Sequence, residues 1–234
     1  MQCYRASLNI RPDYADARNN LGHALADERK YAEAVEHYRI ALRSSPENLE
    51  IHNNLGNALT ELNEVDAAIA QYEFVLKRNP NHADAHNNFG IALAMKGRLD
   101  EAMSHFHEAL RLKSDNASAH GNLGNAFAVQ RKFAEATTHY RAALRLAPSD
   151  AQTLNNLGNV LAEQGLFNQA ATNYRTALEL NPNNPEAHFN LGCTLARVGQ
   201  TEDARQHFAE AIRLKPKYAE ARKQLELLGL PTKP

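Results

Sequence analysis

A leucine or phenylalanine followed by glycine recurs every 34 residues, and this period constrains the fold more than any other feature of the sequence. The pair occurs six times without an insertion, at Leu21-Gly22, Leu55-Gly56, Phe89-Gly90, Leu123-Gly124, Leu157-Gly158 and Leu191-Gly192. A fixed period of roughly 20–50 residues is typical of repeat proteins, in which each repeat packs only against its neighbours. The sequence therefore predicts a stack of similar repeats rather than one globular core.

Three further positions follow the same period. Alanine comes 13 residues after each leucine or phenylalanine, at Ala34, Ala68, Ala102, Ala136, Ala170 and Ala204. An aromatic residue follows four residues later, at Tyr38, Tyr72, Phe106, Tyr140, Tyr174 and Phe208. Proline ends five of the six repeats, at Pro46, Pro80, Pro148, Pro182 and Pro216. Ser114 stands at the remaining end, where Asn116 still offers helix-capping chemistry.

Apolar residues at spacings of three and four predict two amphipathic helices in each repeat. In the first repeat they are Ala17, Leu21, Ala24 and Leu25, followed by Ala34, Tyr38, Ala41 and Leu42. Glycine inside a helix costs ~1 kcal/mol relative to alanine, so a glycine in every repeat needs a packing reason. We expect the small Gly22 and Ala34 to let the two helix backbones approach, and Tyr38 to fill the volume between repeats. Pro46 cannot continue the second helix and ends it.

Together these positions resemble the tetratricopeptide repeat family over essentially the whole chain. The resemblance implies an all-α fold, a right-handed superhelical solenoid of antiparallel helix pairs. It places six repeats at residues 15–48, 49–82, 83–116, 117–150, 151–184 and 185–218. We expect residues 1–14 to be a partial repeat with the second helix only, and residues 219–234 to form a C-terminal capping helix and tail. The tryptophan usual near the start of such a repeat is absent, which changes local packing and not the fold.

Asparagine occupies three positions of the predicted first helices. The first row directly precedes each Leu-Gly or Phe-Gly pair: Asn20, Asn54, Asn88, Asn122, Asn156 and Asn190. The second row lies one residue earlier, at Asn19, Asn53, Asn87 and Asn155. The third row lies three residues after the first, at Asn57, Asn125 and Asn159. Asparagine in a helix interior costs ~0.6 kcal/mol relative to alanine, so a compensating role is expected.

One such role is peptide binding, because a carboxamide can pair with both the N–H and the C=O of a peptide. Neighbouring helices lie ~8–10 Å apart and an extended chain advances ~3.3–3.6 Å per residue, so one asparagine per repeat would meet about every third ligand residue. The alternative is that each amide bonds to the adjacent helix backbone as part of repeat packing. The family resemblance implies that first helices line the concave surface. The row also resembles that of the repeat domain in O-linked N-acetylglucosamine transferases, which implies peptide binding.

We therefore expect a protein–protein interaction scaffold that binds an extended peptide or partner segment in its concave groove. Two alternatives remain open. The first alternative is a substrate-recruiting repeat domain of a larger enzyme such as a glycosyltransferase. It is suggested by the asparagine row and by an abrupt start that indicates a fragment. The second alternative is a structural solenoid that self-associates into a homo-oligomer through its uncapped N-terminal helix, where we expect Tyr4 and Leu8 to lack a partner helix.

Composition and motifs argue against other classes. The formal net charge of -1 supplies no broad positive field for nucleic acid, and no apolar run approaches the length of a membrane span. The sequence contains no nucleophile elbow or phosphate loop, so we expect no catalytic residue and no cofactor. His52, His86 and His120 recur one per repeat, too far apart to converge on one metal ion, and packing explains them better.

The N-terminus lacks the pattern of a secretory signal. Cys3 and Cys193 lie almost a whole chain apart, so we interpret them as small buried apolar residues in a reducing compartment. These two features predict a cytoplasmic protein.

Overall fold

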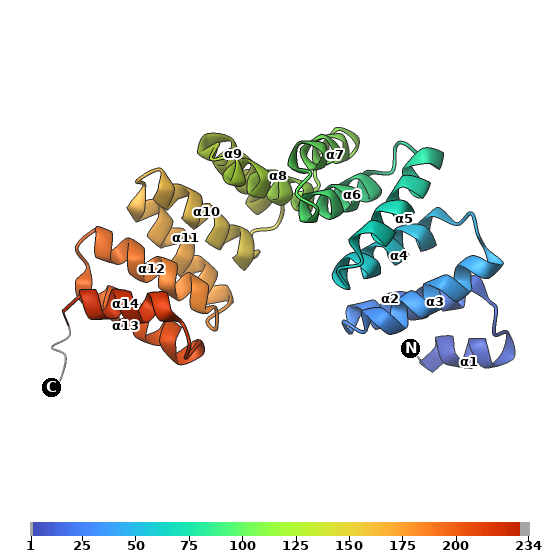
Figure 1. Cartoon of the computed structure of the whole chain (residues 1–234), viewed down its shortest axis with the longest axis horizontal. Helices are drawn as coiled ribbons and strands as arrows, with labels where there is room; N and C mark the ends of the chain where they lie inside the picture. Colours follow the sequence, from blue (N-terminus) through green and yellow to red (C-terminus); the bar gives the residue numbers. More distant parts are fainter. Residues whose placement is uncertain (1, 230–234) are drawn as a thin grey trace. The chain divides into compact units, whose positions relative to one another are not determined.

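The computed structural model describes residues 2–229, and within that range it contains 14 α-helices and no strand (Figure 1). The helices are α1 (Gln2–Ile10), α2 (Ala15–Asp27), α3 (Tyr31–Ser44), α4 (Leu49–Glu61), α5 (Val65–Arg78), α6 (Ala83–Met95), α7 (Leu99–Leu112), α8 (Ala117–Val129), α9 (Phe133–Leu146), α10 (Ala151–Glu163), α11 (Phe167–Leu180), α12 (Pro185–Arg197), α13 (Thr201–Leu214) and α14 (Ala219–Leu227). The predicted all-α fold of helix pairs is confirmed. Every described helix is too short or too polar to cross a lipid bilayer.

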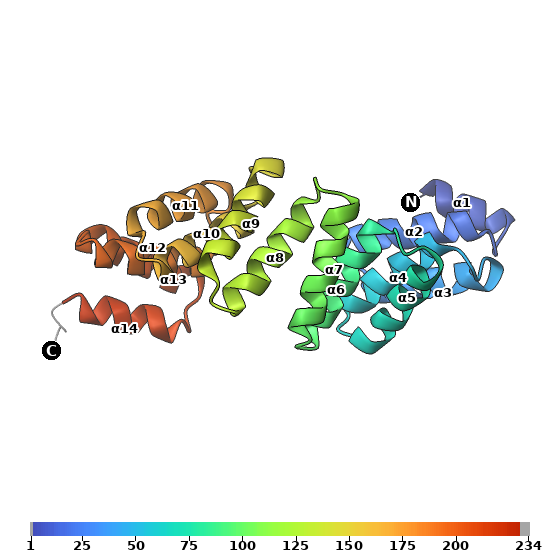
Figure 2. The same cartoon turned by 90° about the horizontal axis from the view of Figure 1, so that it is seen from above.

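The helices form two compact halves, an N-terminal half (Met1–Asp115) and a C-terminal half (Asn116–Pro234). Within the N-terminal half, α2 packs on α3 and α4 on α5, and each pair packs on the next (Figures 1 and 2). The C-terminal half repeats this order from α8 to α14. Each helix therefore contacts mainly its neighbours in sequence, as expected of a repeat protein.

Side chains at the predicted capping positions begin the first helix of most pairs. Asn116 accepts a hydrogen bond from the backbone N–H of Ala119 at 3.0 Å, so the repeat boundary without proline is capped as expected. Asn48 and Asp150 cap α4 and α10 in the same way. The short turn inside each pair passes through the left-handed region, and Gly97 adopts it with φ 75°. Glycine pays no steric penalty there, which ends the first helix cleanly.

The core of each repeat is an aromatic ring of the second helix lying on the glycine of the first. A Cβ atom added to Gly124 would lie 2.6 Å from the ring of Tyr140, and Gly22 stands in the same relation to Tyr38. Both rings are at least 98% buried, with exposed fractions of 2% and 1%. The glycine was expected to let helix backbones approach. The structure shows that it also makes room for the aromatic ring: a Cβ atom added to Gly90 would lie 2.5 Å from the ring of Phe106 and 3.0 Å from the backbone oxygen of Ala102.

Histidines connect the two helices of three repeats. Nδ1 of His86 lies 2.8 Å from Nδ1 of His105, and Nε2 of His86 lies 2.9 Å from the carbonyl oxygen of Pro80. Since the carbonyl can only accept, His86 donates from Nε2 and its Nδ1 accepts from the Nδ1–H of His105. His188 and His207 form the same pair at 2.9 Å. His86, His120 and His188 therefore each pair with a histidine of the same repeat, and His52 bonds to Gln71, in agreement with the expected packing role.

Within the described range, the N-terminal helix α1 packs mainly on α2, and its Leu8 is buried. Ile10 on the same helix is 88% exposed. The prediction that both cysteines are buried is wrong: Cys3 is exposed and Cys193 is only partly buried. Cys3 lies on α1, where a single neighbouring helix covers only one face.

We predict that Gly124→Ala destabilises the protein although alanine is the better helix former. The new methyl group collides with the ring of Tyr140, and such overpacking costs about 1–3 kcal/mol, against ~1 kcal/mol gained in helix propensity. Gly121→Ala, on the same helix, is the matched control, because its Cβ would meet only Thr153 Oγ1 at 3.7 Å. We expect it to be neutral or stabilising in urea unfolding. Equal midpoints for the two variants would contradict the packing role of Gly124.

We also predict that stability falls as the pH drops below about 6.5, the ordinary pKa of histidine. Burial, and next the charge of His86, lowers the pKa of His105; the charges of Glu101 and Glu108 oppose this and that of Arg98 adds to it. The unfolded chain therefore takes up the proton first. Stability that is fully present above the unfolded pKa is lost as the pH falls toward the lowered folded pKa.

The control for this pH dependence is already present in the sequence. Gln71 occupies the repeat position of His105 and lies 2.7 Å from His52. A variant with His105→Gln and His207→Gln should therefore fold, and its urea midpoint should change less between about pH 7 and pH 5 than that of the natural chain. An unchanged pH dependence would show that other groups cause it.

Candidate peptide-binding site

The three rows of asparagines differ in exposure. In the first row, Asn20 is exposed and the other five residues are partly exposed. The second row is interior, with exposed fractions of 7% for Asn19, 9% for Asn53, 6% for Asn87 and 5% for Asn155. In the third row, Asn57 is partly exposed, and Asn125 and Asn159 are exposed. Only the first and third rows therefore offer a surface to a ligand.

The second row joins neighbouring repeats. Asn19 donates from Nδ2 to Glu50 Oε1 at 3.0 Å, and its Oδ1 accepts from Asn54 Nδ2 at 3.1 Å. Asn53 accepts from Asn88 Nδ2 at 3.4 Å. These amides bond to side chains of the next repeat and not to its backbone, which differs from the packing alternative considered above. Asn87 donates to Asn88 of its own repeat at 3.2 Å. Because all four residues of the second row are buried, we leave this row out of the proposed binding surface.

The third row is matched to the core tyrosines. The hydroxyl of Tyr140 donates to Asn125 Oδ1 at 2.7 Å, and that of Tyr72 donates to Asn57 Oδ1 at 2.8 Å. Burial raises the pKa of Tyr140 to about 12, so its hydroxyl keeps the proton that it donates. Where the ring is phenylalanine, as at Phe106, the matching position holds the apolar Ile91.

This match was present in the sequence as a correlation between two repeat positions. Reading the third-row position and the ring together gives His23 with Tyr38, Asn57 with Tyr72, Ile91 with Phe106, Asn125 with Tyr140, Asn159 with Tyr174 and Cys193 with Phe208. Asparagine accompanies tyrosine and never phenylalanine. Tyr38 is the one core tyrosine that is matched to another residue, His23.

Amides of the first row donate to the preceding repeat. Asn156 donates from Nδ2 to Asn125 Oδ1 at 3.0 Å, and Asn190 donates to Asn159 Oδ1 at 2.9 Å. Asn156 Oδ1 accepts from Gln152 Nε2 at 2.9 Å, whereas among the described residues Nδ2 of Asn125 and of Asn159 and Oδ1 of Asn190 have no hydrogen-bond partner. Asn57 Nδ2 and Asn54 Oδ1 are likewise unbonded within the described range. The rows therefore present both donors and acceptors.

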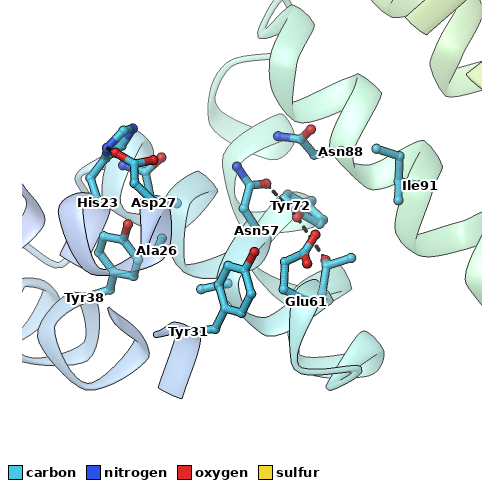
Figure 3. A pocket seen from close by; sticks show the side chains of 13 residues that line it. His23, Ala26, Asp27, Tyr31, Tyr38, Asn57, Glu61, Tyr72, Asn88 and Ile91 are labelled. Atoms are coloured by element: carbon cyan, nitrogen blue, oxygen red, sulfur yellow. Dashed lines mark hydrogen bonds and ion pairs between the residues drawn. The ribbon is translucent and has the colours of Figure 1, made fainter. Parts of the chain in front are cut away.

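A hollow of about 360 Å³ in the N-terminal half lies beside these amides (Figure 3). Asn54, Asn57 and Asn88 line it, together with Asp27 and Glu61. Figure 3 shows the bond between Asn57 and the core ring of its repeat at this wall. In the C-terminal half, a hollow of about 450 Å³ is lined by amides of all three rows. Both volumes lie within the range of ligand pockets, about 300–1,000 Å³.

No group of three or more metal-ligating side chains occurs in the described part of the chain. Burial raises the pKa of the partly buried Cys193 thiol to about 11. That direction is opposite to the lowered pKa that activates a nucleophilic cysteine.

The sequence profile of the cilia and flagella-associated protein 70 C-terminal domain matches residues 5–227. Comparison with the curated proteins gave no match. Among solved structures, a chain of the APC/C hetero-tetramer Cut9-Hcn1 aligns with a TM-score of 0.88 and 17% identity over 97% of this chain, which spans only 45% of that one.

Two further solved structures are similar over nearly their whole length. PilF of Pseudomonas aeruginosa aligns with a TM-score of 0.80 and 21% identity over 91% of this chain and 97% of its own. The tetratricopeptide repeat protein YrrB aligns with a TM-score of 0.67 and 24% identity over 82% of this chain and 99% of its own. At these identities the likeness shows the fold alone.

Asn155 differs from its repeat equivalent Asn19. Its Oδ1 is buried and accepts no hydrogen bond from any described residue. The reason lies in the next repeat: Asn54 donates to Asn19, whereas Asn190 donates to Asn159 and leaves Asn155 unpaired. A buried acceptor without a donor costs about 1–3 kcal/mol.

We predict that Asn155→Ala costs at least about 1 kcal/mol less stability than Asn19→Ala, because it removes an unpaired acceptor and not a bonded one. Urea midpoints of the two variants, compared with the natural chain, measure the difference. Equal losses would show that Asn155 is bonded in solution.

Proposed function

The chain belongs to the family of the cilia and flagella-associated protein 70 C-terminal domain, a tetratricopeptide repeat domain, and from this we propose that it binds an extended segment of a partner protein along the first and third rows of asparagines. Repeat domains of this type are in general protein-interaction scaffolds. The role that we propose is binding without catalysis.

The observation that carries the proposal is the presence of unbonded amide atoms of both kinds beside a hollow in each half. In the N-terminal half, Asn57 Nδ2 would donate to a peptide C=O and Asn54 Oδ1 would accept from a peptide N–H. In the C-terminal half, Asn159 and Asn190 have the same two roles available. Contacts of this kind recognise the main chain, which suits an extended segment of variable sequence.

The bonds between rows also support the proposal. Asn190 is held by Asn159, and Asn159 is held in turn by Tyr174, whose ring is 2% exposed. The amides are therefore oriented before a ligand arrives, which lowers the entropy lost on binding. The similar structure of YrrB is described as that of a protein with an unusual peptide-binding site, which makes a peptide a reasonable ligand class here.

The proposal is tested with peptides selected from a random displayed library on the natural chain and measured by fluorescence polarisation. We expect the variant Asn54→Ala, Asn88→Ala, Asn156→Ala and Asn190→Ala to bind the selected peptides at least about tenfold more weakly, since each lost hydrogen bond is worth about 0.5–1.5 kcal/mol. N-methylation of the peptide backbone should weaken binding similarly.

The matched control is Asn168→Ala with Asn173→Ala, on the second helix α11 and away from both hollows. We expect this variant to bind as the natural chain does. Undiminished binding by the fourfold variant, with its helical circular dichroism intact, would refute the proposal.

A further inference from the structure

We propose that the hollow of the N-terminal half is a site for a cationic side chain, the ammonium of lysine or the guanidinium of arginine, carried by the bound segment. The inference rests on the proposed function and adds the chemistry of one ligand position. The supporting observations are the charges around the hollow and the hydroxyl of Tyr38, which lines it.

Two carboxylates line this hollow, and none of the described residues that line it is lysine or arginine. Asp27 and Glu61 occupy the same repeat position, the last residue of α2 and of α4. The next two repeats have Met95 and Val129 there, so the described structure brings neighbouring carboxylates of this position together only in the N-terminal half.

Both carboxylates stand at the negative ends of their helices. The macrodipole places partial negative charge at a helix C-terminus, where an added carboxylate is unfavourable and a cation is stabilised. The negative charge of Asp27 is partly offset by the ring of His23, whose Nδ1 lies 3.3 Å from Asp27 Oδ2. No described residue bonds to the carboxylate of Glu61. Two helix ends and two acidic side chains therefore direct negative potential into one hollow, and a cationic ligand group would relieve it.

The hydroxyl of Tyr38 is the second, independent observation. Tyr38 is 1% exposed and lines the hollow, and no described residue hydrogen-bonds to its hydroxyl. Tyr72, at the same position of the next repeat, donates to Asn57. The residue matched to Tyr38 is His23, whose ring nitrogen is engaged by Asp27.

Figure 3 shows the Tyr38 hydroxyl directed toward His23 and Asp27, from the wall into the hollow. The hydroxyl oxygen is not fully buried, so it is accessible from the hollow and can accept a hydrogen bond from a ligand there. A ligand ammonium or guanidinium would donate to its oxygen while contacting the carboxylates. Tyr31 lines the same hollow and adds an aromatic ring, which favours cations over neutral groups.

The test uses the full ¹⁵N-labelled chain and two small probes, N-acetyl-lysine N′-methylamide and N-acetyl-norleucine N′-methylamide. The probes share their backbone and aliphatic stem and differ in the ammonium. Titrations followed by ¹H–¹⁵N spectra should show saturable shifts for the backbone amides of Asp27 and Glu61 with the lysine probe, and at least fivefold weaker binding of the norleucine probe.

Three variants locate the effect. Asp27→Asn with Glu61→Gln should abolish the preference for lysine, and Tyr38→Phe should reduce it. Glu163→Gln changes the same repeat position in the C-terminal half and should leave the preference unchanged. Circular dichroism confirms that each variant is folded.

Equal binding of both probes, a lysine preference that survives the double carboxylate variant, or no shift of the hollow's amides would each overturn the inference. The fourfold asparagine variant separates this result from the peptide proposal. If that variant no longer binds the selected peptides and the natural chain shows no preference between the probes, the main-chain binding proposal is supported and the cationic site is refuted. If the lysine preference is present and the selected peptides bind the fourfold variant normally, the cationic site stands without the peptide proposal.

Discussion

The contact on which each repeat depends is that of an aromatic ring with a helix residue that has no side chain. At Gly124 the ring of Tyr140 occupies the space that a Cβ atom would fill. This close approach fixes the distance and rotation of the two helices in a pair, because a ring packed to this density tolerates little displacement. In the pair of α6 and α7, where Gly90 lies against the ring of Phe106, the bond between His86 and His105 also joins the two helices.

The ring also decides what the surface above it contains. A tyrosine brings a hydroxyl to the end of the core, and above Tyr72, Tyr140 and Tyr174 an asparagine accepts its hydrogen bond. A phenylalanine needs no acceptor, and Ile91 stands above Phe106. The amide-bearing surface is thus partly a consequence of core chemistry. A ligand would bind to the amide atoms that the core leaves unbonded, such as Nδ2 of Asn125 and of Asn159.

Much of the fold could be predicted because it is local. Helices of 13 or 14 residues, a short turn and a capped boundary are encoded within one period, and the period itself reports that the pairs stack. The candidate site was predictable only in part. The sequence identified three rows of asparagines but gave no ground for separating the buried Asn53 from the partly exposed Asn54, since adjacent residues on a helix differ by about 100° and either can face inward.

The sequence by itself determined the repeat, its helices, the glycine beneath each ring and the residues available at each position. The tertiary structure decided which of those residues are bonded and which are left. Asn88 bonds to Asn53, whereas Asn190 bonds to Asn159, although Asn53 and Asn155 share one repeat position and Asn57 and Asn159 share another. The choice depends on distances of about 3 Å across the junction of two repeats, where several donors compete for each acceptor. A linear pattern lists the competitors, but only their positions in space select the pairs.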